Sequence, residues 1–341
     1  MAQGMAQESP VVVGWKDGKT TIETERASLT LSNRIQFRFT HEDPDSGNGK
    51  DSFRIRRAKT KLDGWLYKKN LTWELQLNWA DTSSSLEDAN INYAFSRALQ
   101  IKGGQFKVPF GRQELTSSGS QQFVDRSIVS SEFAKGRDAG VQIWGLSRDN
   151  RFEWRAGAFN GNGRNASSND NGALQYDARV TFQPWGDVKY SESDFESSGR
   201  PLLAVAVQYE HNDRHGATAG NDVSRAIAGG DVAFKYRGIS AFGEFFHRDN
   251  HPESGPDSAS DGWNVQAGIF VVPRTIEVAA RYATWDPSDR AAHDRRTESG
   301  IALNWFINKH NLKLQSDLRR IEHQAAGTSD LEARMQLQFI F

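Results

Sequence analysis

The last eleven residues of the chain alternate strictly between apolar and polar side chains. The apolar set is Leu331, Ala333, Met335, Leu337, Phe339 and Phe341, and the polar set is Glu332, Arg334, Gln336 and Gln338. A period of two is typical of a β-strand, whose successive side chains point to opposite faces. About 9–11 residues is also the length at which a tilted strand crosses a bilayer. The pattern therefore predicts a strand that a membrane barrel could use.

The same alternation recurs along most of the chain. It covers residues 29–39, 53–62, 71–79, 88–95, 141–143, 152–158, 174–182, 202–210, 226–237, 239–247, 263–272, 275–285, 297–307 and 311–322. With the terminal strand we expect about sixteen strands, to within about two. Short turns at 272–275 and 308–311 contrast with long polar connections at 211–224, 249–262 and 286–296. Short turns at one rim and long loops at the other are typical of outer-membrane barrels.

The two faces of these strands differ in chemistry. Apolar faces end in aromatic residues, among them Trp65, Trp79, Trp144, Trp154, Trp185, Trp263, Trp285 and Trp305, as in interfacial girdles. The opposite faces carry charged or amide side chains at nearly every position, which a dry core does not tolerate. A soluble β-sandwich is the alternative, although its strands are shorter and its inner faces favour Val, Ile and Leu.

We therefore predict an all-β protein: a closed antiparallel transmembrane β-barrel of about 16 strands. No linker or change in composition divides the chain, so residues 1–341 are expected to form a single domain, with 1–26 as a polar lead-in. The terminal strand is expected to pair with residues 29–39, because closure removes the free edges of the sheet.

Composition narrows the class further. Hydrophobic residues are 37% of the 341, and mean hydropathy is -0.67. No run approaches the roughly 18 apolar residues of a membrane helix, but barrel strands need no such run. The net charge of -1, from 42 basic and 43 acidic residues, gives no overall field that favours nucleic acid. Cysteine is absent, which excludes disulfides, thiolate metal sites and cysteine nucleophiles. The amino terminus shows no basic region followed by an apolar core, so no signal peptide is visible.

Basic residues concentrate on two early strands. They are Arg34, Arg38, Arg54, Arg56, Arg57, Lys59 and Lys61. Rows of Arg and Lys in a pore favour anions, because their donors replace lost hydration. Alternatively, acids such as Glu74 and Asp88 neutralise them in a salt-bridged wall, and both interpretations stay open. Arg57 has the opposite parity to Arg54 and Arg56, so one of this group must lie at a bulge, at a rim or on the outer face.

Between Gln105 and Arg137 the alternation lapses, in a segment containing Pro109, Gly111 and Gly119. This connection is longer than about 15 residues, and loops of that length inside a compact domain are usually functional.

Specific residues at the start of this segment carry a family resemblance. They are the stretch from Gly103 to Arg112 (GGQFKVPFGR), the upstream FRIRRA at 53–58, the ELTSS at 114–118 and the terminal Phe341. With them the chain resembles the phosphate-selective porin O and P family over essentially its full length. The resemblance implies a sixteen-stranded, trimeric outer-membrane porin of Gram-negative bacteria whose third extracellular loop folds into the barrel and narrows it.

By position, the resemblance implies a constriction loop at 106–137. Its candidate pore-lining cations would be Arg34, Arg56, Arg57, Lys59, Lys107 and Arg112, and Phe341 would be the signal for outer-membrane assembly. The chain is shorter and less basic than a dedicated phosphate channel should be. We expect passive diffusion of small hydrophilic solutes, with a preference for phosphate or similar small anions.

Other functions find less support in the sequence. The 8 His lie mostly in predicted loops, where chance proximity to Ser accounts for any hydrolase-like pair, so we expect no enzyme. The acidic run 43–51 lacks the spacing and closing Glu of a calcium loop. No cofactor, metal or nucleic-acid partner is implied; the expected partners are small solutes, outer-membrane lipid and two further copies of the chain. A structural barrel that encloses a partner and a non-selective general porin remain alternatives.

Overall fold

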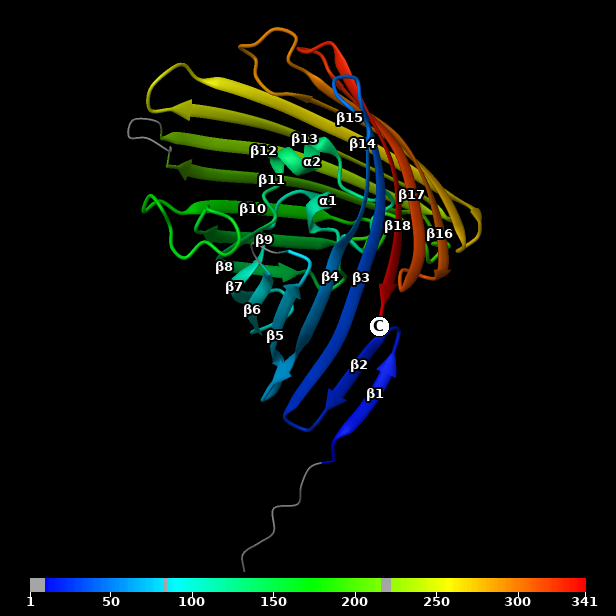
Figure 1. Cartoon of the computed structure of the whole chain (residues 1–341). Helices are drawn as coiled ribbons and strands as arrows, with labels where there is room; N and C mark the ends of the chain where they lie inside the picture. Colours follow the sequence, from blue (N-terminus) through cyan, green and yellow to red (C-terminus); the bar gives the residue numbers. More distant parts are fainter. Residues whose placement is uncertain (1–9, 82–84, 216–221) are drawn as a thin grey trace, which may run out of the picture.

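The computed structural model consists almost entirely of one antiparallel sheet closed on itself (Figure 1). It describes residues 10–81, 85–215 and 222–341. The strands are β1 Val12–Lys16, β2 Lys19–Glu23, β3 Ala27–Pro44, β4 Lys50–Leu66, β5 Lys68–Asn78, β6 Leu86–Ala94, β7 Gln100–Lys107, β8 Arg137–Leu146, β9 Phe152–Phe159, β10 Gln175–Phe182, β11 Leu202–Arg214, β12 Val223–Tyr236, β13 Ile239–Pro252, β14 Ser258–Val272, β15 Ile276–Asp286, β16 Arg296–Asn308, β17 Leu312–His323 and β18 Thr328–Ile340. Two short helices, α1 Arg112–Leu115 and α2 Ile128–Phe133, lie between β7 and β8.

Sixteen of these strands, β3 to β18, form the barrel, which confirms the predicted fold class. Each pairs with its neighbours in sequence, and β18 returns to β3 with Asp330 opposite Pro44 and Ile340 opposite Arg34. The pairing that closes the barrel therefore uses residues 34–44 of β3. Residues 28–31 of the same strand pair with β2 instead. Phe341 exchanges two backbone hydrogen bonds with Asn33 at the junction. The closed wall has no free edge along β3–β18, as the alternation required.

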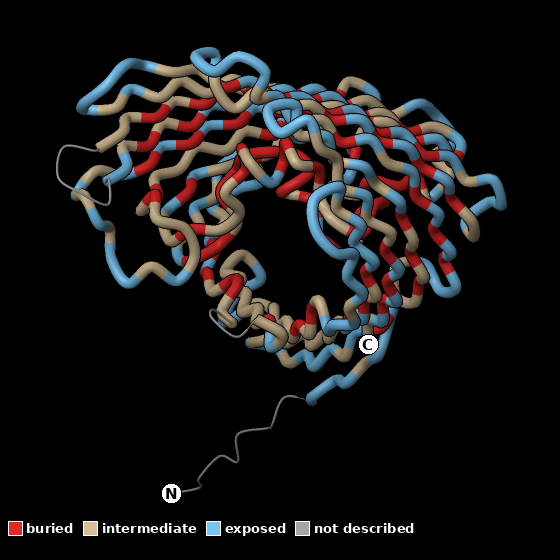
Figure 2. Tube along the Cα trace, turned by 45° about the horizontal axis from the view of Figure 1, so that its top comes forward, coloured by how far each residue is buried: buried red, intermediate tan, exposed pale blue. Residues whose placement is uncertain are grey.

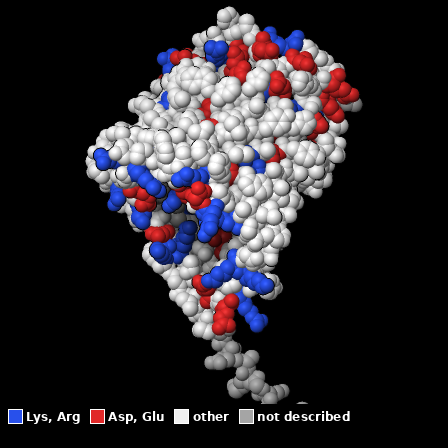
Figure 3. Space-filling model, turned by 180° about the vertical axis from the view of Figure 1, so that it is seen from behind, with Lys and Arg blue, Asp and Glu red and all other residues white. Residues whose placement is uncertain are grey.

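The outer face of the wall is apolar. Side chains such as Val207, Ile301, Leu303 and Met335 are exposed, while their neighbours along each strand face inward. Figure 3 shows the result on one side of the molecule as a broad band with few charged side chains, below a charged rim. In the described part of the chain, no helix is long and apolar enough to cross a membrane.

Connections at the two ends of the barrel differ. The end that carries the C-terminus, here called the turn end, has mostly short connections, such as Arg237–Gly238 between β12 and β13. The opposite end, called the loop end, has longer ones. Two long segments fold inward: residues 108–136 from the loop end, called the lumenal loop, and residues 183–201 from the turn end, called the turn-end segment. Figure 2 shows much of the buried chain gathered along one side of the opening that the wall encloses.

Three features differ from the pattern-based expectation. β7 was not expected as a strand, because Gly103 and Gly104 interrupt its alternation; Gly104 has φ +123°, and a Cβ there would lie 2.2 Å from the Ala89 carbonyl oxygen. Residues 12–23 of the expected lead-in form a β1–β2 hairpin around Asp17 and Gly18, whereas residues 1–9 lie outside the described residues. The turn-end segment is the third, a long connection at the end where only short turns were expected.

The apolar outer face predicts that the free-energy cost of placing an Arg on it depends on how deep the position lies in the membrane. We expect Ile301→Arg, in the middle of β16 and 62% exposed, to destabilise the barrel by about 2–4 kcal/mol, because lipid would solvate the charge poorly. Thr297→Arg, on the same face near the loop end, should cost only about 0–1 kcal/mol. Urea titration of the protein folded into lipid vesicles, followed by tryptophan fluorescence, measures both. Equal costs would contradict a lipid-facing position for Ile301.

Candidate functional site

A water-accessible cavity of about 600 Å³ lies inside the barrel between the lumenal loop and the wall formed by β3 to β9. Its described lining contains twelve Lys or Arg residues and four Asp or Glu residues. The basic residues are Lys19, Arg34, Arg56, Arg57, Lys59, Lys61, Lys102, Lys107, Arg126, Arg137, Arg155 and Arg164; the acidic ones are Glu74, Asp81, Glu87 and Asp88. Because the whole chain is nearly neutral, this surface is strongly enriched in positive charge. Figure 3 shows Lys and Arg side chains around a hollow below the apolar band.

The lumenal loop is held over the opposite side of the lumen by carboxylates. Because this loop is not part of the sheet, its buried backbone N–H groups need other acceptors. Four of them donate to carboxylate oxygens at 2.7–2.9 Å: Gln113 to Glu244, Gln122 to Glu192, Val124 to Asp317 and Ile128 to Glu298. Three of these acids project from β13, β16 and β17, and Glu192 belongs to the turn-end segment. A buried N–H group without an acceptor is costly, so these anchors fix the path of the loop.

Carbonyl groups of the loop are bound in the same way. The side-chain amide of Gln36 donates to the backbone carbonyl of Ser118. In the same way, Gln315 donates to the carbonyl of Gln121, and Gln338 donates to the carbonyl of Gly119. Amides at inward positions of β3, β17 and β18 therefore satisfy the acceptors, as the wall acids satisfy the donors. The loop is bound to the wall along its whole length.

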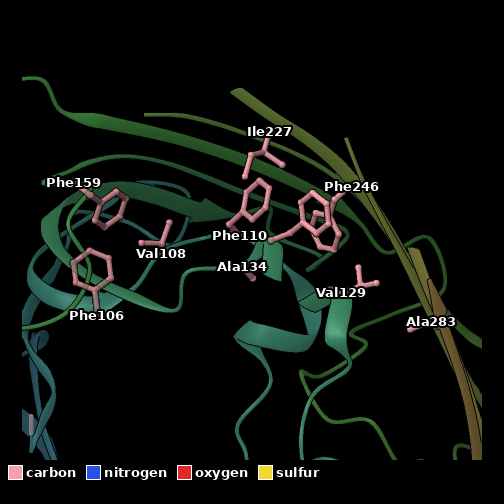
Figure 4. Packing of buried hydrophobic residues seen from close by; sticks show 10 residues of the cluster. Phe106, Val108, Phe110, Val129, Ala134, Phe159, Ile227, Phe246 and Ala283 are labelled. Carbon is pink, nitrogen blue, oxygen red and sulfur yellow. The ribbon is translucent and has the colours of Figure 1, made fainter. Parts of the chain in front are cut away.

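Aromatic packing adds a third kind of anchor (Figure 4). Phe110 and Phe133 of the loop pack against Phe246 of β13. The ring centroid of Phe246 lies 5.6 Å from that of Phe110 and 5.3 Å from that of Phe133. Figure 4 shows Ile227 and Val129 beside the same cluster, and all five side chains are almost completely buried. Burying one such side chain stabilises by about 1.5–3 kcal/mol. The side of the lumen in front of β12–β15 is thus filled, and the cavity remains on the other side.

Asp125 of the lumenal loop joins these two sides. Its carboxylate lies 2.5 Å from Arg38, 3.6 Å from Arg334 and 3.7 Å from both Arg56 and Arg57. Burial works to raise the pKa of Asp125, but the guanidinium of Arg38, with those of Arg57 and Arg56, outweighs it and holds the pKa well below its usual range. The carboxylate therefore stays ionised, and a single negative charge is shared among four arginines. Arg56 and Arg57 retain positive charge toward the cavity.

Other cations of the lining are individually paired. Lys59 contacts Glu87 at 2.5 Å, Arg137 contacts Asp88 at 2.7 Å, and Lys61 contacts Glu74 at 3.2 Å. These pairs correspond to the salt-bridged wall that was one interpretation of the sequence. Arg34 differs, because its Nη1 donates to the Ser117 hydroxyl at 3.0 Å, and no carboxylate lies within 4 Å of it in the described chain. Lys102, also without a carboxylate partner there, lies over the Phe106 ring at 5.2 Å.

Six of the nine cations singled out in the sequence line this cavity: Arg34, Arg56, Arg57, Lys59, Lys61 and Lys107. Arg54 pairs with Arg38 across β3 and β4 and is exposed nearer the loop end. Arg38 is 1% exposed, held by Asp125 and Gln336.

The ninth, Arg112, lies on the other side of the loop, where it donates to the backbone of Val188 and Lys189. The parity conflict at Arg56 and Arg57 is accommodated by a register shift in the β3–β4 ladder, so both side chains reach the lumen.

Six lining cations were not singled out in the sequence: Lys19, Lys102, Arg126, Arg137, Arg155 and Arg164. Arg155 has the inward parity, opposite to Trp154, so alternation alone could have found it. Arg126 and Arg164 lie in connections, where parity carries no information. Among the described residues, no group of three or more His, Cys, Asp or Glu side chains is arranged to hold a metal ion.

Known proteins of similar structure are barrels of the outer membrane. The anion-selective porin from Comamonas acidovorans superposes with a TM-score of 0.70 at 12% identity, covering 92% of this chain and 100% of that one. The outer membrane channel DcaP of Acinetobacter baumannii gives 0.65 at 11% identity over 94% and 99%. OmpT of Vibrio cholerae, in a trimer form, gives 0.61 at 9% over 92% and 100%. At these identities the similarity establishes the fold.

Sequence comparison identifies the family. An uncharacterized protein of Aquifex aeolicus (strain VF5) is 21% identical over 364 aligned residues, which cover 93% of this chain and 87% of that protein. The family model "Phosphate-selective porin O and P" matches residues 28–341, the whole barrel from the start of β3 to the C-terminus. The resemblance found in the sequence is thereby confirmed, and this chain belongs to the phosphate-selective porin O and P family of outer-membrane porins.

Proposed function

We propose that this porin prefers small anions and that the lumenal loop is its constriction. The observation that supports this is the lining of the open cavity, where cations outnumber acids twelve to four in a chain whose net charge is -1. A pore that presents one sign of charge raises the local concentration of the opposite ion. Passive diffusion of small hydrophilic anions, with phosphate among the candidates, fits both this lining and the family.

On the other wall, the lumenal loop covers acids together with cations that pair with them, such as Glu298 with Arg281 at 3.1 Å and Asp317 with Arg334 at 2.7 Å. Glu244, Glu298 and Asp317 are at most 5% exposed, and each accepts a backbone N–H of the loop. These three carboxyl groups are buried under the loop and do not line the cavity. The basic strands β3 and β4 face water instead, so the path for solutes runs along them.

Residues of the path differ in their proposed roles. Arg34 and Arg56 are the cations best placed to bind a passing anion, since Arg34 has no carboxylate partner among the described residues and Arg56 shares Asp125 with three other arginines. Arg57, Lys59, Lys61 and Lys107 contribute to the field of the wall, and exposed Arg54 does so nearer the loop end. Arg38 and Arg112, both buried, position the two in-folded segments.

The surroundings of the barrel are part of the same proposal. The apolar outer band fits outer-membrane lipid of a Gram-negative cell and, over part of its area, two further copies in a homotrimer. Phe341, 43% exposed and stacked on Phe339 at 5.0 Å, is accessible as an assembly signal. The family and the fold support a channel rather than an enzyme.

Conductance through a planar lipid bilayer tests the proposal directly. Under a salt gradient, the reversal potential should show higher permeability for chloride than for potassium, and added phosphate should reduce the chloride current. Absence of channels would favour a barrel that encloses a partner. A reversal potential near zero would indicate a non-selective porin and contradict the anion preference.

Substitutions at Arg34 and Arg56 test the path. Arg34→Gln and Arg56→Gln should each lower the ratio of anion to cation permeability by up to about fivefold, since water-exposed charge interactions are worth about 0.2–1 kcal/mol. Arg320→Gln removes the same charge from the exposed outer rim and serves as the matched control. If the three variants shift the ratio equally, the proposed path along β3 and β4 is wrong.

A further inference from the structure

The turn-end segment enters the lumen from the end opposite to the lumenal loop and meets it there. It connects β10 to β11 and includes Val188, Glu192, Ser193 and Asp194, which are 2–5% exposed. The Glu192 N–H donates to the Ser120 carbonyl of the loop at 3.0 Å, so the two backbones touch. The interior of the barrel is therefore filled from both ends.

Glu192 is the centre of this contact. Its Oε2 accepts hydrogen bonds from the Gln122 backbone at 2.7 Å and from Gln266 of β14 at 2.9 Å, and its Oε1 accepts one from Gln113 at 3.0 Å. One carboxylate thus joins two points of the loop to the wall. No Lys or Arg side chain lies within 4 Å of it in the described chain, so hydrogen-bond donors alone compensate its burial. All three donors require an acceptor at this position.

Both flanks of Glu192 are fixed as well. Ser193 donates to Glu277 of β15 at 2.8 Å, and Glu277 also accepts from the Gln122 side chain at 2.7 Å. Phe195 packs on Phe306, with centroids 5.5 Å apart. On the other flank, Arg112 of the loop donates to the Val188 carbonyl at 2.9 Å. The segment is held by the wall, and it holds the loop in turn.

We propose that the turn-end segment is a clamp on the lumenal loop, with Glu192 as the positioning residue that keeps the loop over the acids of β13–β17. The clamp sets both the width of the cavity and its charge. If it is released, the loop moves, the cavity widens, and wall acids such as Glu244 and Glu277 face water. Its effect on selectivity rests on the anion preference proposed above; its effect on loop position does not.

The clamp can be tested by replacing Glu192 with a residue of similar shape that has one hydrogen-bond acceptor oxygen fewer. Glu192→Gln keeps the volume but replaces one acceptor oxygen by an NH₂ donor, which then faces at least one existing donor. A buried donor without an acceptor is costly, so the local contact should open. Glu196→Gln, four residues along the same segment at an exposed position, loses the same charge without this conflict and is the matched control. Ser193→Ala removes only the hydrogen bond to Glu277 and provides a milder variant.

Two readouts separate the clamp from the proposed function. Ala302→Cys places a single thiol, in a chain without cysteine, on the β16 wall beneath Phe123 of the loop. A small charged, membrane-impermeant thiol reagent should label this cysteine on the order of tenfold faster with Glu192→Gln than with Glu196→Gln, the scale expected for loss of one buried hydrogen-bonded contact. Ser193→Ala should give an intermediate rate. In bilayers, Glu192→Gln should raise single-channel conductance and lower the permeability ratio for anions.

Equal labelling rates in folded Glu192→Gln and Glu196→Gln would overturn the clamp, whatever the selectivity. Faster labelling without a change in permeability ratio would overturn its role in selectivity. If Glu192→Gln fails to assemble, Ser193→Ala decides: a labelling rate equal to that of Glu196→Gln overturns the clamp. A wild-type channel without anion preference would refute the proposed function, while the labelling comparison would still test the clamp.

Discussion

Buried backbone N–H groups in a loop that has no sheet partner are the constraint on which this lumen depends. A segment that crosses the inside of a barrel cannot leave such groups without acceptors. Here the wall supplies carboxylates, and Gln113, Val124 and Ile128 donate to Glu244, Asp317 and Glu298. These acids bind the loop and, through the same contacts, are removed from the solute path.

A nearly neutral chain can therefore present a basic channel. Its charges are balanced overall but unevenly exposed: under the loop, acids are matched by buried cations such as Arg281 and Arg334, whereas cations outnumber acids on the open wall of β3–β9. Asp125 marks the border, because it anchors the loop to Arg38 and Arg334 while neutralising only part of the charge of Arg56 and Arg57. In this protein the electrostatics of the pore follows from where a loop lies rather than from net composition.

The two in-folded segments depend on each other and on the wall. Glu192 receives donors from the lumenal loop and from β14, so movement of the turn-end segment alters both the position of the loop and the exposure of the wall acids. The outer face plays no part in this network. It is apolar, as lipid requires, and the polar network is confined to the inside.

Much of the fold follows from the sequence because a strand between lipid and water must alternate, and alternation is visible without coordinates. It predicted the sixteen-stranded barrel, its closing strand and a long connection between Gln105 and Arg137, and it placed Arg34 and Arg56 on inward faces. The family resemblance, not the alternation, implied that this connection folds inward. Lys59 shares the parity of Phe53 and Ile55, and it faces inward because of the register shift in the β3–β4 ladder. It missed β7, where glycines replace apolar residues, and it did not mark residues 183–201 as an in-folded connection, although the gap between Phe182 and Leu202 was readable.

Only the tertiary structure decided which inward cations meet water, because parity separates inside from outside but not covered from open. Arg38 and Arg112 are covered and Arg126 and Arg164 are open for that reason: the course of two irregular segments is set by hydrogen bonds to residues far away in the sequence.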